Sequence, residues 1–178
     1  MFTMEHKSSL GKVFDVFVTE PLRTHYVKEI AKKIYLAPTS VKIHLGYLLM
    51  QNLIMKKKGE RFFGFVANRD NSNFLFYKRM YNIIKLKESG LLDFLINSFY
   101  PRAIVVYGSY IRGEDVETSD IDLFIITKVK KRLILEKFEE ILKRRVHIIV
   151  EDSLKKLSPE LKMEVINGFV LYGYLKNG

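Results

Sequence analysis

The chain has 178 residues, of which 48% are hydrophobic, and its formal net charge at pH 7 is +10. That apolar share supports a packed core and excludes an intrinsically disordered chain, while the length suits one medium domain or two small ones. There is no cysteine, which excludes disulfides and thiolate metal sites. The excess of 30 Lys and Arg over 20 Asp and Glu favours polyanionic partners, although lysines that only solvate helix surfaces would produce the same balance.

The start of the chain lacks the basic-then-apolar form of a signal peptide. No uninterrupted apolar run is long enough to cross a bilayer. We therefore expect a cytoplasmic protein that has no membrane partner.

The first third of the chain predicts three helices followed by a β-hairpin. Apolar residues at helical spacing indicate a helix over 8–18 and a second over 25–33 that is capped by Thr24. A third helix is expected to begin at Pro38, because proline is favoured in the first turn of a helix. Two apolar segments within 53–66 flank a run of basic residues, which indicates a hairpin with a basic tip.

This order of elements resembles a winged helix-turn-helix domain, which we place at residues 1–68. Many domains of this type bind protein, but the basic hairpin and the overall charge favour nucleic acid, specifically duplex DNA, as the partner. The candidate DNA-binding residues lie at the start of the third helix and on the hairpin: Thr39, Ser40, Lys42, His44, Lys56, Lys57, Lys58 and Arg61. The hairpin cations would contact phosphates, which gives affinity with little sequence discrimination.

A polar, turn-prone stretch at 68–73 marks a domain boundary. Helical patterns over 74–87 and 91–99 then predict a helical connector at 69–100. This connector would cover a sheet or form the interface of a homodimer. A further domain is expected at 101–178.

The most informative stretch is a strand, a glycine turn and a second strand that opens with two aspartates. The apolar run 103–107 predicts a buried strand that ends at Gly108 and Ser109, where free backbone N–H groups can hold an anion. Asp120 and Asp122 are two residues apart, so in an extended chain both carboxylates leave the same face. Two carboxylates this close repel each other unless they share a proton or bind a divalent cation. A phosphate cradle beside a cation site is what phosphoryl or nucleotidyl transfer requires.

This stretch resembles the signature of the DNA polymerase beta nucleotidyltransferase superfamily, which is Gly-Ser, ten further residues and then Asp-x-Asp followed by apolar residues. Tyr110 to Gly113 is most similar to its minimal nucleotidyltransferase type, and the resemblance covers about the C-terminal half of the chain. It implies transfer of a nucleoside monophosphate from a triphosphate such as ATP to an acceptor, with release of pyrophosphate. It also implies two Mg²⁺ ions held by three carboxylates, of which Asp120 and Asp122 would be two. The nucleotide-binding residues that it implies are Gly108, Ser109 and Arg112. The intervening Glu114, Asp115 and Glu117 are expected to be solvated loop charges.

The third carboxylate of the family is not identified in this chain. On the strand expected at 144–150, His147 stands where an aspartate is expected, on the same face as Ile149 and Glu151. His147 could serve as a neutral ligand or as a base, although imidazole suits Mg²⁺ less well than a carboxylate does. Glu151 and Asp152 are alternative carboxylates that lie one or more residues too far along the strand.

The remaining patterns predict a helix over 131–143 and a last helix that starts at Ser158. The stretch 169–173 that follows it resembles the close of the minimal nucleotidyltransferases. We therefore predict an α+β fold, with a winged helix-turn-helix followed by a small mixed-sheet nucleotidyltransferase fold with flanking helices.

Two functions remain open. In the first, the chain is a Mg²⁺-dependent nucleotidyltransferase whose catalytic residues are Asp120, Asp122 and His147. In the second, it is a DNA-binding regulator whose nucleotidyltransferase domain has lost catalysis and binds only a nucleotide or a partner. A related version of the second is an antitoxin-like role, in which the partner is a small helical toxin.

Overall fold

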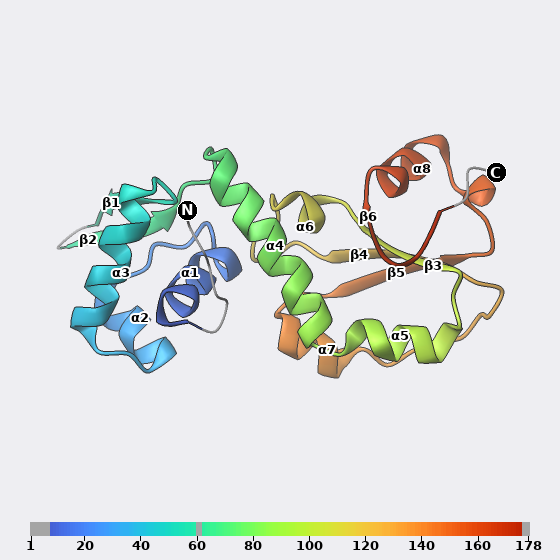
Figure 1. The fold of residues 1–178 in the computed structure, drawn as a ribbon, viewed down its shortest axis with the longest axis horizontal. Helices are drawn as coiled ribbons and strands as arrows, with labels where there is room; N and C mark the ends of the chain where they lie inside the picture. The colour runs from blue at the N-terminus through green and yellow to red at the C-terminus, as the bar shows by residue number, and fades with distance from the viewer. Residues whose placement is uncertain (1–7, 60–61, 176–178) are drawn as a thin grey trace. The chain divides into compact units, whose positions relative to one another are not determined.

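The computed structural model describes residues 8–59 and 62–175. The chain divides into two compact units, Met1–Tyr81 and Asn82–Gly178 (Figure 1). Helix α4, Ser72–Glu88, runs through the boundary, so the residues expected to form one connector, 69–100, are shared between the two units. No helix in the described part of the chain is both long and apolar enough to span a membrane.

The N-terminal unit has the predicted order of three helices and a hairpin. Its elements are α1 (Ser9–Thr19), α2 (Val27–Ile34), α3 (Pro38–Met50), β1 (Ile54–Lys58) and β2 (Phe63–Ala67), with the first part of α4. Ser8 caps α1, because its hydroxyl accepts a hydrogen bond from the backbone N–H of Gly11 at 3.0 Å. The core forms around Phe14, whose ring meets those of Phe74 and Tyr81 edge to face at centroid distances of 5.6 and 5.4 Å.

The predicted helix cap at Thr24 is wrong. Helix α2 begins only at Val27, and the residue before it, Tyr26, makes no side-chain cap. His25 instead forms an antiparallel bridge with Phe65 of the hairpin, with N to O distances of 2.8 and 2.9 Å in the two directions. A long-range sheet contact therefore takes the backbone groups that local propensity assigned to a helix.

The C-terminal unit is built on a four-stranded mixed sheet. Its helices are α5 (Leu91–Phe99), α6 (Ser109–Arg112), α7 (Glu136–Leu142), α8 (Pro159–Ile166) and a short 3₁₀ turn at Leu154–Lys156. Its strands are β3 (Ala103–Tyr107), β4 (Ile121–Ile126), β5 (Val146–Glu151) and β6 (Phe169–Gly173), in the order β5-β4-β3-β6. The β4–β5 pair is parallel and the other two pairs are antiparallel. The structure is thus α+β with a mixed sheet, as predicted.

The helix predicted over 131–143 is shorter than expected, because α7 begins at Glu136. Leu133 and Leu135 are partly buried and pack against the core, while Ile134 between them is 80% exposed. This alternation belongs to a non-helical backbone, so the helical spacing of the leucines was misleading there. The last helix agrees with the prediction: the Ser158 hydroxyl accepts from the Leu161 N–H at 3.3 Å, directly before Pro159.

Each face of the sheet packs against different helices (Figure 1). Ile104 and Val106 point into the core that includes residues of α5 and α7. Ala103, Val105 and Tyr107 point to the opposite face, where Val165 of α8 packs against them. Because Phe124 belongs to this second core and strand residues alternate, Asp122 also faces the side of α8.

Candidate functional site

Three neighbouring strands bring Tyr107, Asp122 and His147 into one row across the sheet. Tyr107 of β3 pairs with Asp122 of β4 in the antiparallel ladder, and Asp122 pairs with His147 of β5 in the parallel ladder. His147 Nδ1 lies 3.3 Å from Asp122 Oδ1. The Asp122 side chain is 30% exposed and that of His147 is 58% exposed, so a ligand can reach both from solvent. Asp120, just before β4, is exposed as well.

The Gly108 turn packs directly against Asp122. Gly108 has φ +75° and ψ −159°, a conformation that residues with a Cβ rarely adopt. A Cβ at this position would lie 2.8 Å from Asp122 Oδ2. The two oxygens of Asp122 therefore have different neighbours, because Oδ2 lies against the turn and Oδ1 lies beside His147. Ser109 follows as the half-buried first residue of α6.

Tyr107 is a site residue that the sequence analysis did not single out. Its burial, followed by the negative charges of Asp122 and Glu164, raises the pKa of Tyr107 to about 12. The phenol is therefore neutral at physiological pH and shares the face of Asp122. The alternation of β3 provided a signal for it, since Tyr107 is the last residue on the face that carries Ala103 and Val105.

Arg112, expected to bind a phosphate, lies between two carboxylates. Its Nε donates to Glu114 at 2.8 Å and its Nη1 donates to Glu164 of α8 at 2.9 Å. The hydrogen bond to Glu114 is the main cause that raises the pKa of Arg112. Glu164 was not predicted as a neighbour of the motif, and no local pattern could have revealed it, because it lies 52 residues further along the chain.

The loop between the glycine turn and the two aspartates is anchored by a buried polar cluster. Asp115, expected to be a solvated loop charge, is only 1% exposed, so that prediction is wrong. Asn82 Nδ2 donates to Asp115 Oδ1 at 2.8 Å and to the Tyr110 carbonyl at 2.7 Å. Arg144 Nη2 lies 3.4 Å from Asp115 Oδ2. These contacts hold the loop at Tyr110 and at Asp115, which restricts where the neighbouring Ser109 can lie.

Glu151 and Asp152 cannot replace the missing third carboxylate. Glu151 lies four residues beyond His147 on β5, where it pairs with Ile126 of β4. At about 3.3 Å per residue, Glu151 is roughly 13 Å from His147 along the strand. Both acids are also ion-paired to Lys156, at 3.7 and 3.0 Å. His147 is thus the residue of β5 that lies next to Asp122.

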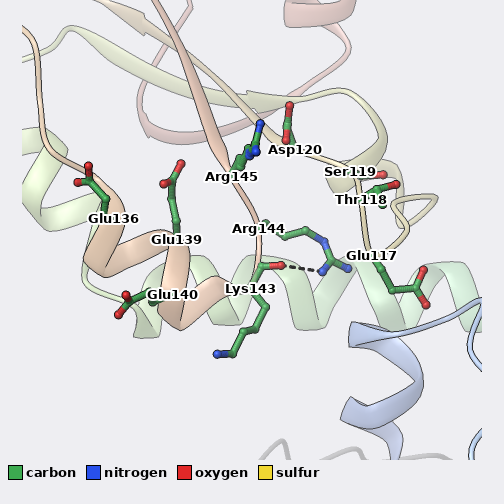
Figure 2. A pocket seen from close by; sticks show the side chains of 10 residues that line it. All are labelled: Glu117, Thr118, Ser119, Asp120, Glu136, Glu139, Glu140, Lys143, Arg144 and Arg145. Atoms are coloured by element: carbon green, nitrogen blue, oxygen red, sulfur yellow. Dashed lines mark hydrogen bonds between the residues drawn. The ribbon is translucent and has the colours of Figure 1, made fainter.

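A hollow of about 720 Å³ opens beside Asp120 (Figure 2). The side chains that line it include acidic, basic and hydroxyl groups: Glu117, Thr118, Ser119, Asp120, Glu136, Glu139, Glu140, Lys143, Arg144 and Arg145. In Figure 2 the Arg145 side chain extends toward Asp120. A hollow of this volume can accommodate a ligand of nucleotide size.

The donors at the site fit a pair of Mg²⁺ ions poorly. Mg²⁺ favours oxygen ligands in octahedral geometry, and the site combines Asp120 and Asp122 with the imidazole of His147. Within residues 8–59 and 62–175 there is no group of three or more His, Cys, Asp or Glu side chains disposed to hold a metal ion. The two-magnesium arrangement implied by the resemblance therefore stays a prediction.

The candidate DNA-binding residues all lie in the N-terminal unit. Thr39 and Lys42 of α3 are exposed, while Ser40 and His44 are half-buried. Lys56, Lys57 and Lys58 follow one another on β1 and are all exposed. Arg61 lies outside the described residues.

Residues 89–172 match the family model of the nucleotidyltransferase domain. The match contains β3, β4 and β5 with the site residues on them, which supports a nucleotidyltransferase domain in this part of the chain and nucleotidyl transfer as its general activity. It does not extend to the N-terminal unit, where the winged helix-turn-helix stays a prediction. No curated protein and no solved structure was found to match the chain.

Proposed function

We propose that the C-terminal unit transfers a nucleoside monophosphate from a nucleoside triphosphate, with ATP as the first candidate, to an acceptor. A nucleophilic oxygen of the acceptor would attack the α-phosphorus, and the bond to the bridging oxygen of pyrophosphate would break. The observation that carries the proposal is the packing of the Gly108 turn directly against Asp122, which brings the expected phosphate cradle next to this carboxylate. The match of residues 89–172 to the nucleotidyltransferase domain is independent support.

The roles of the individual residues follow from their positions. Ser109 and the backbone around Gly108 would contact phosphate oxygens, because the turn leaves no side chain between backbone and ligand. Asp120 and Asp122 would hold the cation that balances the charge of the triphosphate. Arg112 could contact a phosphate only by exchanging it for Glu114 or Glu164.

The experiment is label transfer from α-³²P-ATP in the presence of a divalent cation. We expect the unchanged protein to label an acceptor in a cell extract, and Asp120→Asn/Asp122→Asn to lower that labelling by roughly 100-fold, since removing transition-state charge stabilisation has effects of this size. Asp93→Asn, an exposed aspartate on α5 that pairs with Lys87, is the matched control and should label normally. Equal labelling by the double variant would refute the assignment.

We propose in addition that the N-terminal unit binds duplex DNA through α3 and the hairpin. Four exposed lysines support this function: Lys42 on α3, and Lys56, Lys57 and Lys58 on β1. Changing the three β1 lysines to glutamine should reduce the slope of log K against log salt concentration by up to about 2.7, because each phosphate that a lysine neutralises contributes about 0.9 to that slope. The control is the same change at Lys128, Lys130 and Lys131, which are also exposed. An equal effect in both variants would show that only overall charge matters.

His147 stands where a third carboxylate is expected, and this favours one alternative, in which the domain has lost catalysis. In that case the chain is a DNA-binding regulator or an antitoxin-like protein, and its C-terminal unit binds a nucleotide or a partner such as a small helical toxin. Salt-dependent DNA binding without label transfer to any acceptor would support this alternative over the enzyme.

A further inference from the structure

A second hollow, of about 660 Å³, lies at the other end of the sheet from the Gly108 turn. It is lined by Tyr100, Arg102, Thr127, Lys128, Val129, Asp152 and Ser153, which precede β3 or follow β4 and β5. Ala103 pairs with Ile126 and Tyr107 pairs with Asp122, so four residues of strand, roughly 13 Å, separate the two ends. This far-end hollow is therefore distinct from the candidate nucleotide site.

Hydrogen bonds hold the walls of the far-end hollow together. The Thr127 hydroxyl donates to the Phe99 carbonyl at 2.8 Å and accepts from the Val129 N–H at 3.1 Å. The guanidinium of Arg102 donates to the Asp152 carbonyl. The end of α5, the start of β3 and the ends of β4 and β5 are thus tied to one another, and the hollow is part of the folded C-terminal unit.

The charge around the far-end hollow is positive. Arg102 and Lys128 line it, and the carboxylate of Asp152 is paired with Lys156 at 3.0 Å. Three more cations, residues 130–132, follow on an exposed segment that is not helical. This surface suits an anionic ligand with several charges.

Tyr100 adds an exposed aromatic ring to these cations. Its side chain is 80% exposed, and it ends α5 with φ +44° and ψ +55°, directly before the buried Pro101. A bulky residue at positive φ is uncommon, and a residue before proline is normally extended, so the backbone at Tyr100 is strained. Strained residues of this kind cluster at functional sites. A tyrosine ring in a basic groove offers a face on which a nucleobase can stack.

We propose that the far-end hollow binds single-stranded nucleic acid, with one base stacked on Tyr100 and the neighbouring phosphates on Arg102 and Lys128. A base in a duplex is already stacked on its neighbours and is not available to Tyr100, so the hollow selects single strands. The inference requires neither the proposed transfer reaction nor duplex binding by the N-terminal unit.

The test is fluorescence anisotropy of the full-length protein with labelled oligothymidine and oligouridine of equal length. We expect Tyr100→Leu to weaken binding at least about 5-fold, the lower limit for the loss of one stacked base, and Tyr100→Phe to bind as the unchanged protein does. Tyr35→Leu is the matched control, because Tyr35 is an exposed tyrosine that ends α2 with a similar φ of +56°. The strand that binds more tightly identifies the ligand as RNA or DNA.

A second pair of variants separates this surface from the hairpin. Changing Lys128, Lys130 and Lys131 to glutamine should weaken single-strand binding and reduce its slope against log salt concentration by up to about 2.1, since each phosphate contact on a single strand contributes about 0.7. The same change at the three β1 lysines should leave single-strand binding unaltered. Equal weakening of single-strand binding by the two triple variants would show that only overall charge matters, and would overturn the proposal.

A last measurement uses the unchanged protein and avoids any folding effect of a variant. An oligonucleotide that carries 5-iodouracil, bound and irradiated with ultraviolet light, should cross-link to the peptide that contains Tyr100. A cross-link found only elsewhere in the chain, or equal binding by Tyr100→Leu and Tyr100→Phe, would refute the stacking role. Label transfer from ATP is not involved, so this result and the failure of the proposed function are distinguishable.

Discussion

Replacing Gly108 with alanine places a methyl group where Asp122 now packs against the backbone. Two costs add. The conformation at φ +75° and ψ −159° is nearly restricted to glycine and costs about 1–3 kcal/mol for other residues. The new Cβ would also lie 2.8 Å from Asp122 Oδ2, so the carboxylate or the turn must move. We expect the C-terminal unit to lose about 3 kcal/mol of stability.

Hydrogen exchange read by mass spectrometry on peptides from β3 and β4 measures this loss locally, since it separates the C-terminal unit from the N-terminal one. Gly90→Ala is the matched control. Gly90 has nearly the same φ, +76°, but its ψ of 0° lies in the left-handed helical region and a Cβ there has nothing within 4 Å, so its variant reports the smaller strain of that region without the contact. We expect it to cost about 1 kcal/mol. If Gly108→Ala costs no more than Gly90→Ala, the close approach of Asp122 to the turn is not what requires the glycine.

Burial lowers the pKa of His25, whose Nε2 lies 3.0 Å from the Glu20 carbonyl, so the native state resists protonation. The unfolded state then binds more protons, so the N-terminal unit should lose stability as the pH falls below about 6.5. Melting curves recorded at several pH values measure this dependence. His25→Gln should remove it, whereas the control His44→Gln should retain it. Asp115→Ala removes a carboxylate partner from the buried Arg144 and should destabilise the C-terminal unit by about 3 kcal/mol, measured by hydrogen exchange as for Gly108→Ala. A loss below about 1 kcal/mol would show that the pair of Asp115 and Arg144 does not anchor the loop. Arg112→Gln breaks two half-exposed ion pairs and should change the free energy of unfolding by less than about 1 kcal/mol. An accompanying 10-fold loss of ATP affinity would identify Arg112 as a phosphate contact, and unchanged affinity would remove it from the site.

Local sequence patterns were sufficient for most elements of the fold. The predicted ranges of α5 and β3 coincide with the observed ones, and the last helix starts at the predicted place, directly after Ser158. These features depend on the spacing of apolar residues and on hydrogen bonds within one turn, so a short stretch of chain contains the information. The same local rules misplaced the start of α2, because the bridge of His25 to Phe65 is a contact between distant segments.

For the site, the sequence by itself determined which residues carry chemistry: a glycine turn with a serine, two aspartates at a spacing that puts them on one face, and a histidine on a later strand. Only the tertiary structure decided which of them meet. The parallel register of β4 and β5 brings His147 to 3.3 Å from Asp122 and takes Glu151 to the other end of the sheet. Strand register results from how whole faces pack, and a shift of one residue would turn His147 to the opposite face, so no local pattern could have specified this pair.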